Sequence, residues 1–153
     1  MKIIAYTMQY SGKVPAESSI HCIPYDGSYF AEYMKKYNEC FREMRKALEI
    51  EPFDYLSSPQ QIRDRQDSIF LLLEDGRIAG SVACYGNEID DLIVSKEYQG
   101  RGYGKELLLW AMNRIRQSND DPITLHVAEW NEKAVNLYRK SGFSTVKTEC
   151  VRE

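Results

Sequence analysis

The sequence predicts a mixed α/β domain of the α+β type. Three observations carry this prediction: short apolar runs of strand length, stretches with apolar residues every three or four positions, and turn dipeptides such as Asp75-Gly76. A length of 153 residues is typical of one domain, so we expect residues 1–153 to fold as a single unit.

Seven apolar runs are predicted to form strands. They cover residues 1–10, 20–25, 68–74, 77–85, 88–94, 123–128 and 143 to about 151. Asp75-Gly76 and Gly86-Asn87 separate the third, fourth and fifth runs by tight turns, which predicts an antiparallel meander.

Periodic apolar positions predict three main helices. They cover residues 29–48, 104–117 and 131–141. Gly142 follows the third, where a helix commonly ends in a left-handed residue. Ser58-Pro59 is a favourable helix start and predicts a short polar helix that extends to about residue 67.

Composition narrows the class of protein. The formal net charge of −3 argues against non-specific nucleic-acid binding, which needs a basic surface. Four cysteines without a C-x-x-C pair and two histidines give no zinc spacing, so we expect free thiols and no metal. No stretch approaches the ~20 apolar residues of a spanning helix, and the first apolar run is too short for a signal peptide. We therefore expect a cytoplasmic protein that does not bind membranes.

A glycine-rich segment lies between the fifth predicted strand and the following helix. It reads Gln99-Gly100-Arg101-Gly102-Tyr103-Gly104 and is followed by Lys105. Three glycines leave backbone N–H groups open to an anion, and the start of the helix adds a positive end at the same place. A pyrophosphate is the expected occupant, with added charge from Arg101 and Lys105.

Two other phosphate-binding motifs fit this segment less well. A P-loop needs Ser or Thr after Gly-Lys, and Glu106 stands there instead. A dinucleotide fingerprint needs G-x-G-x-x-G, and the glycines here are one residue too close, although Glu129 lies at a suitable distance to hold a ribose. The 24 residues after Glu129 are too few for the rest of a doubly wound sheet.

The pattern Gln99-x-x-Gly102-x-Gly104 resembles the (Gln/Arg)-x-x-Gly-x-(Gly/Ala) loop of the GNAT N-acetyltransferase superfamily. Further matches in order and spacing are Leu125-x-Val127, Asn131, Ala134, Leu137-Tyr138 and Gly142-Phe143. The resemblance covers residues 88–143 well and extends to the earlier residues only as element order. It implies a GNAT-type fold, with a mostly antiparallel mixed sheet flanked by helices and splayed between the family's fourth and fifth strands, here 88–94 and 123–128.

The resemblance implies that acetyl-CoA is the donor and that its arm pairs with the backbone of the 88–94 strand. The residues so implied in donor binding are Leu92, Ile93, Val94, Gln99, Gly100, Arg101, Gly102, Tyr103, Gly104, Lys105, Asn131 and Tyr138. A buried strand, a strand-to-helix turn and a helix N-cap at Asn131 are the plain structural alternatives.

The resemblance also implies that Tyr138 protonates the departing thiolate, against the alternative of a core aromatic. The implied general base is Glu88, with Asp90 as second candidate. Strand alternation puts Glu88, Asp90, Leu92 and Val94 on one face, so Asp91 faces away unless a bulge intervenes. His126 and Glu129 are more distant candidates for the base.

The function implied is that of an enzyme, an acetyl-CoA-dependent N-acyltransferase, which transfers acetyl to a primary amine of a small molecule or peptide in a ternary complex. The alternative is a GNAT-like module that binds acyl-CoA without turnover. Only about ten residues follow Gly142-Phe143, fewer than the family's last two strands need. We expect residues 2–10 to cover the edge left open there, in the same chain or in a partner, and a homodimer stays open beside a monomer.

Overall fold

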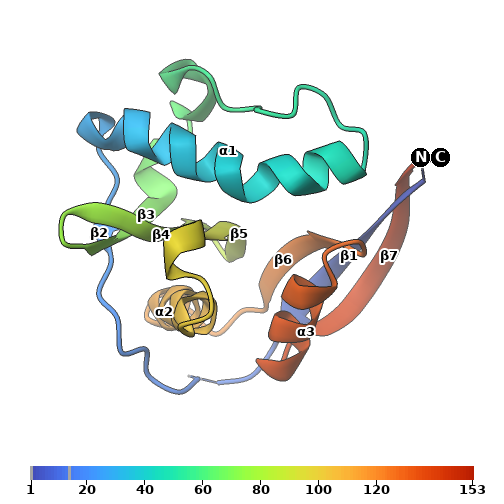
Figure 1. Ribbon diagram of the computed structural model, residues 1–153. Helices are drawn as coiled ribbons and strands as arrows, with labels where there is room; N and C mark the ends of the chain where they lie inside the picture. The colour runs from blue at the N-terminus through green and yellow to red at the C-terminus, as the bar shows by residue number, and fades with distance from the viewer. Residues whose placement is uncertain (1, 14) are drawn as a thin grey trace.

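The computed structural model describes residues 2–13 and 15–153. A sheet of seven strands has the order β2-β3-β4-β5-β6-β1-β7. Its strands are β1 (Ile3–Tyr10), β2 (Ile23–Pro24), β3 (Ile69–Glu74), β4 (Arg77–Tyr85), β5 (Glu88–Val94), β6 (Ile123–Ala128) and β7 (Ser144–Arg152). Helix α1 (Phe30–Ala47) lies on one face of the sheet, and α2 (Tyr103–Arg116) and α3 (Glu132–Lys140) lie on the other (Figure 1). The predicted fold class is confirmed.

Two predicted elements are shorter than expected. The second strand keeps only Ile23–Pro24, followed by a 2.9 Å hydrogen bond from Tyr25 N to Ile69 O of β3. The predicted short polar helix is two separate 3-10 segments, Pro59–Ile62 and Gln66–Ser68. Ser58 and Gln61 form a capping box at this start, but only Ile62 of the first segment is buried, so no apolar stripe supports a longer helix.

Strand β1 lies inside the C-terminal half of the sheet. It is antiparallel to β6, with Thr7 opposite His126, and antiparallel to β7 on its other side, with Thr7 opposite Lys147. The predicted edge-covering role of residues 2–10 is therefore confirmed within the same chain. Met1 of the predicted strand lies outside the described residues.

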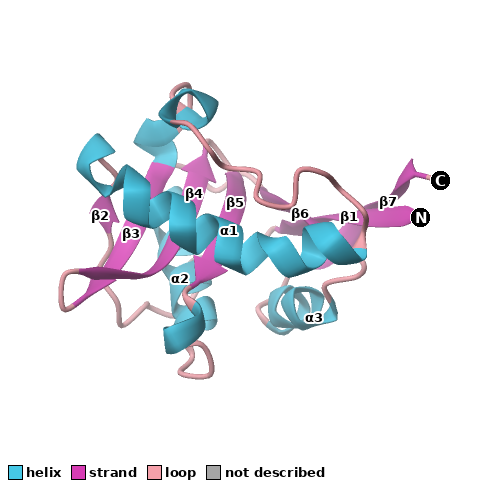
Figure 2. Cartoon of the chain, turned by 45° about the horizontal axis from the view of Figure 1, so that its top comes forward, coloured by secondary structure: helices cyan, strands magenta, loops and turns pink. Residues whose placement is uncertain are grey.

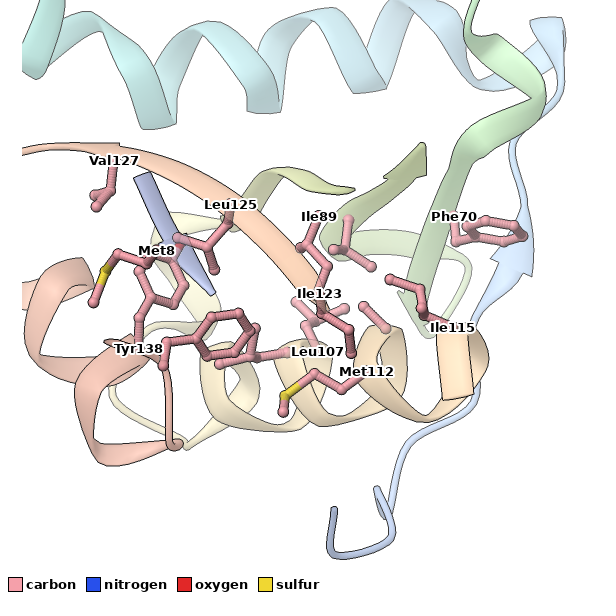
Figure 3. Close-up of a cluster of buried hydrophobic side chains, with 14 of the residues drawn as sticks. Met8, Phe70, Ile89, Leu107, Met112, Ile115, Ile123, Leu125, Val127 and Tyr138 are labelled. Carbon is pink, nitrogen blue, oxygen red and sulfur yellow. The ribbon is translucent and has the colours of Figure 1, made fainter. Parts of the chain in front are cut away.

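The two faces of the sheet carry separate apolar clusters. Leu107 and Met112 of α2, Tyr138 of α3 and Leu125 of β6 belong to the first cluster (Figure 3). The second cluster lies between the sheet and α1 and is built around Tyr33. In Figure 2, α1 crosses strands β3, β4 and β5. No helix of the described residues is long and apolar enough to cross a bilayer.

Strands β5 and β6 part soon after they meet. They are parallel and share one residue pair, Glu88 with Thr124, next to a hydrogen bond of 2.9 Å from Thr124 N to Asn87 O. The rest of β5 has β4 as its ladder partner. The predicted splay is confirmed, and it turns one backbone edge of β5 toward the opening.

Candidate active site

A bulge interrupts β5 in the middle of the splayed region. The β4 ladder pairs Ser81 with Ile93 and then Ala83 with Asp90, so two residues of β5 lie opposite Val82 alone. The first of them, Asp91, has φ of +45°, a left-handed conformation that is uncommon outside glycine.

The bulge corrects the predicted alternation. Leu92 and Val94 pack in the same cluster as Ile89, on the side of α2, whereas the carboxylates of Asp90 and Asp91 both reach Arg65. The prediction that Asp90 shares a face with Leu92 and Val94 is therefore wrong. An extra residue in a strand shifts the two-residue period by one, and every later side chain changes sides.

Asp91 has the electrostatic features of a reactive carboxylate. Its side chain is 14% exposed, and Oδ2 is buried without a hydrogen-bond partner among the described residues. Burial raises the pKa of Asp91 to about 6, the charge of Asp90 adds to this, and Arg65 opposes it. The sequence did not predict Asp91 as the base, because alternation turns it away unless a bulge intervenes, and the bulge is present.

Arg65 approaches both carboxylates from the segment between α1 and β3. Its Nη2 lies 3.5 Å from Asp91 Oδ2 and its Nη1 lies 3.8 Å from Asp90 Oδ2. Tyr33 and Tyr37 of α1 adjoin this group, and burial, followed by the charge of Asp91, raises the pKa of both phenols. The Tyr33 hydroxyl is buried, with no hydrogen bond from the described part of the chain. The site thus combines two acids, one guanidinium and an aromatic wall.

Glu88 lies where β5 and β6 are still joined. Its Oε1 is 3.1 Å from Nε2 of His126, whose Nδ1 is 3.1 Å from Oγ1 of Thr7. Glu129, another distant candidate for the base, accepts a 2.7 Å hydrogen bond from the Tyr6 hydroxyl. These contacts place Glu88 and His126 in a polar chain across three strands, at the point where the splay begins.

The glycine-rich segment forms the turn into α2. Gly100 has φ of +81° and Gly102 has φ of +84°, so both positions favour glycine. Gly102 is the N-cap residue of α2, and no side chain of the described residues caps this helix. The first-turn N–H groups therefore remain available to an anion. Gln99 Nε2 donates a 3.0 Å hydrogen bond to Val94 O and fixes the turn to the end of β5.

Two side chains of this turn, Arg101 and Tyr103, contact neighbouring residues. The guanidinium of Arg101 lies 5.1 Å from the ring centre of Tyr98, and the Tyr103 hydroxyl donates a 2.8 Å hydrogen bond to Glu74. Lys105 is exposed at the start of α2. Arg101 and Lys105 thus leave positive charge beside the open N–H groups.

Helix α3 meets the same region. A Cβ placed on Gly104 would lie 3.8 Å from Leu137 Cδ2 and 3.9 Å from Val94 Cγ2, so α2, α3 and the end of β5 converge there. Tyr138 is buried, and burial, with a smaller contribution from Asp90, raises its pKa to about 12. Asn131 Oδ1 accepts a 3.3 Å hydrogen bond from Ala134 N, which confirms the N-cap interpretation.

The arrangement offers three chemical elements near β5. They are an uncapped helix start at α2, a buried phenol at Tyr138 in the cluster beside α2 and a carboxylate of raised pKa at Asp91 beside Arg65. The described residues contain no group of three or more metal-ligating side chains. Such a set can hold a phosphorylated ligand, donate one proton and accept another.

Comparison with known proteins identifies the family. The model of the acetyltransferase (GNAT) family matches residues 30–143. Mycothiol acetyltransferase of Propionibacterium freudenreichii is 34% identical over 76 residues, which are 50% of this chain and 22% of that protein. N-alpha-acetyltransferase MAK3 of Arabidopsis thaliana is 30% identical over 86 residues, 51% of this chain and 45% of that protein. The match therefore spans less than half the length of these curated relatives.

Solved structures show the same fold. An acetyltransferase from the GNAT family of Colwellia psychrerythraea superposes with a TM-score of 0.75 at 12% identity, over 97% of this chain and 55% of that one. A protein from Pyrococcus horikoshii OT3 gives a TM-score of 0.68 at 23% identity, over 88% of this chain and 100% of that one. With the family model matching most of its length, the chain belongs to the GNAT acetyltransferase family.

Proposed function

We propose that this chain is an enzyme that transfers the acetyl group of acetyl-CoA to a primary amine of a small molecule or peptide. The observation that carries this proposal is the convergence at Gly104 of the uncapped start of α2, the end of β5 at Val94 and α3 at Leu137, the residue before Tyr138. A module that only binds acyl-CoA has no need of a proton donor and a carboxylate of raised pKa beside the opening.

The donor fits the residues that line this opening. Backbone N–H groups of residues 99–104 would hold the pyrophosphate, because Gly100 and Gly102 adopt a turn that leaves them open. The Arg101 and Lys105 side chains add positive charge. The edge of residues 92–94, apart from the Val94 carbonyl that accepts from Gln99, would pair with the pantetheine arm as an added strand does, with Asn131 near the same arm. An N–H of this edge would also polarise the thioester carbonyl.

Asp91 is our first candidate for the general base. A carboxylate with a pKa of about 6 is ionised at neutral pH and is a stronger base than an exposed one. Glu88 is engaged with His126, and Asp90 has a side chain that is 46% exposed beside Arg65. Glu88 and Asp90 remain proposed candidates for the general base, ranked after Asp91. A water relay is the remaining alternative.

The proposed reaction is a direct displacement. Asp91 takes a proton from the acceptor ammonium, and the amine nitrogen then attacks the thioester carbonyl carbon. The new C–N bond forms as the C–S bond breaks, and the Tyr138 phenol gives its proton to the departing thiolate sulfur. The nitrogen loses its second proton as it becomes an amide, that proton restores the Tyr138 phenol, and Asp91 returns its own proton to solvent. A pKa of about 12 keeps Tyr138 protonated until that step. Holding both reactants in line supplies much of the rate.

The proposed class of acceptor is supported by the names of two relatives and by the charge of the residues around Asp91. One relative is named for mycothiol and another for N-alpha-acetyl transfer, which supports a small molecule or a peptide amine. The Asp90–Asp91–Arg65 group carries one net negative charge when both acids are ionised, and this favours a cationic amine over an anionic acceptor. All four cysteines are free thiols, which supports the cytoplasm as the proposed location.

Calorimetric titration with acetyl-CoA tests the donor site first. We expect wild-type binding near micromolar, lost in Gly102→Glu, because a carboxylate then occupies the anion site. Gly86→Glu is the matched control, since Gly86 also has positive φ and open surroundings and lies in the β4–β5 turn. A panel of primary amines, with release of free CoA thiol as the readout, follows. Absence of wild-type binding would overturn the proposal.

A further inference from the structure

Strand β7 leaves one side of the sheet open. It pairs with β1 on one edge and is the last strand in the sheet order (Figure 2). Eight of its nine residues are exposed, including Val146 at 55% and Val151 at 58%. The opposite margin of the sheet is the two-residue β2, which ends at Pro24. Short edges with proline resist pairing, whereas a long exposed edge is a template for another strand.

The middle of β7 is a short regular run. Register shifts against β1 make Val146 and Val151 extra residues, one near each end of the strand. Between these two bulges, residues 147–150 stay in register with β1. Because bulges bend a strand, a pairing partner has to align with this central run.

The charges of the central run are arranged symmetrically. Lys147 and Glu149 flank Thr148 and lie on the same face of the strand, opposite Thr7 and Ala5 of β1. The Lys147 Nζ and Glu149 Oε2 atoms are 3.7 Å apart. Two β7 strands from two copies of the chain can lie antiparallel, related by a two-fold axis that passes through the Thr148 positions. Lys147 then faces Glu149 of the second copy, Glu149 faces its Lys147, and the two threonines face each other.

Neighbouring registers lack this complementarity. Moving the axis to residue 147 sets two lysines opposite each other, and moving it to residue 149 sets two glutamates opposite each other. Like charges in directly opposed positions destabilise a strand pair, and opposite charges and Thr–Thr pairs stabilise it. The sequence of the edge therefore selects one self-complementary register.

We propose that two copies of this chain associate through β7, antiparallel and centred on Thr148, into one continuous sheet. The interface is isologous and closes at two copies. Strands β6 and β1 separate it from the opening beside β5, so both donor sites stay accessible. The proposal goes beyond the proposed function and does not depend on catalysis.

Charge reversal tests the pairing. Sedimentation velocity should give twice the 17.8 kDa chain mass for the wild type at tens of micromolar. Lys147→Glu and Glu149→Lys, each alone, should shift the protein to monomer, and the double variant should restore the dimer. Lys133→Glu, at an exposed position of α3, makes the same charge change as Lys147→Glu and should remain dimeric. Thermal unfolding of each variant separates loss of pairing from loss of folding.

Several outcomes would overturn the proposal. One is a wild type that stays monomeric up to hundreds of micromolar, which would leave the edge to a strand of another protein. Another is a dimer that both single reversals leave intact, or a double variant that remains monomeric.

Cysteine cross-linking tests the register. In Thr148→Cys with Cys150→Ser, the new thiols face each other across the axis and should oxidise to a covalent dimer. Thr145→Cys with Cys150→Ser is the matched control, because Thr145 is also an exposed threonine of β7 and would face Val151. Equal or faster cross-linking at residue 145 would overturn the proposed axis.

Discussion

Arg65 Nη2 lies 3.5 Å from Oδ2 of Asp91, and that oxygen is buried without a hydrogen bond from the described residues. The two residues come from the segment before β3 and from the bulge of β5. At this distance the guanidinium favours the ionised carboxylate, yet burial outweighs it and the pKa of Asp91 still rises to about 6. Burial and the Arg65 guanidinium therefore act in opposite directions on the proton affinity of Asp91, and burial is the larger effect.

Replacing the proposed base Asp91 should remove the fall of kcat/KM at acidic pH, here called the acid limb. In the wild type, kcat/KM should fall as pH drops through about 6, because Asp91 becomes protonated. Asp91→Asn should lower kcat/KM at pH 8 by about 10²- to 10⁴-fold, the usual contribution of a general base. Asp90→Asn and Glu88→Gln are the comparison variants. A normal rate in Asp91→Asn, with loss in either comparison variant, would move the base assignment to that residue.

The same substitution should raise stability at neutral pH. A folded-state pKa of about 6, above the ordinary value near 3.9, means that the folded chain binds this proton more tightly than the unfolded chain. The stabilisation is full below about pH 4 and is lost as pH rises through about 6. Relative to wild type, the free energy of unfolding of Asp91→Asn should therefore increase by up to about 3 kcal/mol between pH 4 and pH 7. Urea denaturation at both pH values checks this, and a constant difference would contradict it.

Much of the sheet could be predicted because its signals are local. The Asp75-Gly76 and Gly86-Asn87 turns define the β3–β4–β5 meander, and the glycine spacing defines the turn into α2. The place of β1 between β6 and β7 could be predicted only as the cover of an open edge. Strands far apart in sequence choose partners by packing, which a pattern along one segment does not encode.

The site could be predicted less completely than the fold. Gly104 of the predicted turn lies near Leu137 of α3, the residue before Tyr138, and the roles of residues 99–104 and Tyr138 stay predictions. Asp91 was considered only in the case of a bulge, because strand alternation favours Glu88 and Asp90, and nothing in an Asp-Asp pair tells which residue takes the left-handed bulge conformation. Arg65 was missed because it is one of several charged residues in a polar segment, and only the folded chain brings it to β5.

Removing Arg65 should shift the acid limb toward higher pH. Arg65 lowers the pKa of Asp91, so Arg65→Gln leaves burial and Asp90 unopposed and raises that pKa further. We expect a larger loss of kcat/KM at pH 6 than at pH 8. Arg63→Gln is the matched control, because Arg63 is exposed two residues away. An equal loss at both pH values would show a structural role for Arg65 and contradict this prediction.

Tyr138→Phe should separate turnover from donor binding. The phenyl ring keeps the packing against Phe143, whose ring centre lies 6.2 Å away, and removes only the proton donor. The rate should fall by about 10²-fold or more, with acetyl-CoA affinity within about twofold of wild type. Tyr10→Phe is a control, because Tyr10 also packs against Phe143 and its hydroxyl bonds only the Lys13 carbonyl in the described chain. Unchanged turnover in Tyr138→Phe would remove the acid role.

Gly80→Ala should destabilise the fold where α2 packs on β4. A Cβ at this position would lie 2.7 Å from Leu107 Cδ1 and 2.9 Å from the Ile93 carbonyl oxygen. The leucine end can rotate, but the carbonyl belongs to the β4–β5 ladder, so backbone has to move. Overpacking of this kind costs about 1–3 kcal/mol of unfolding free energy. Gly27→Ala has no atom within 4 Å of the new Cβ and should change stability by less than about 0.5 kcal/mol. Urea denaturation of the two variants measures the difference, and equal midpoints would show that the sheet yields at Gly80 without strain.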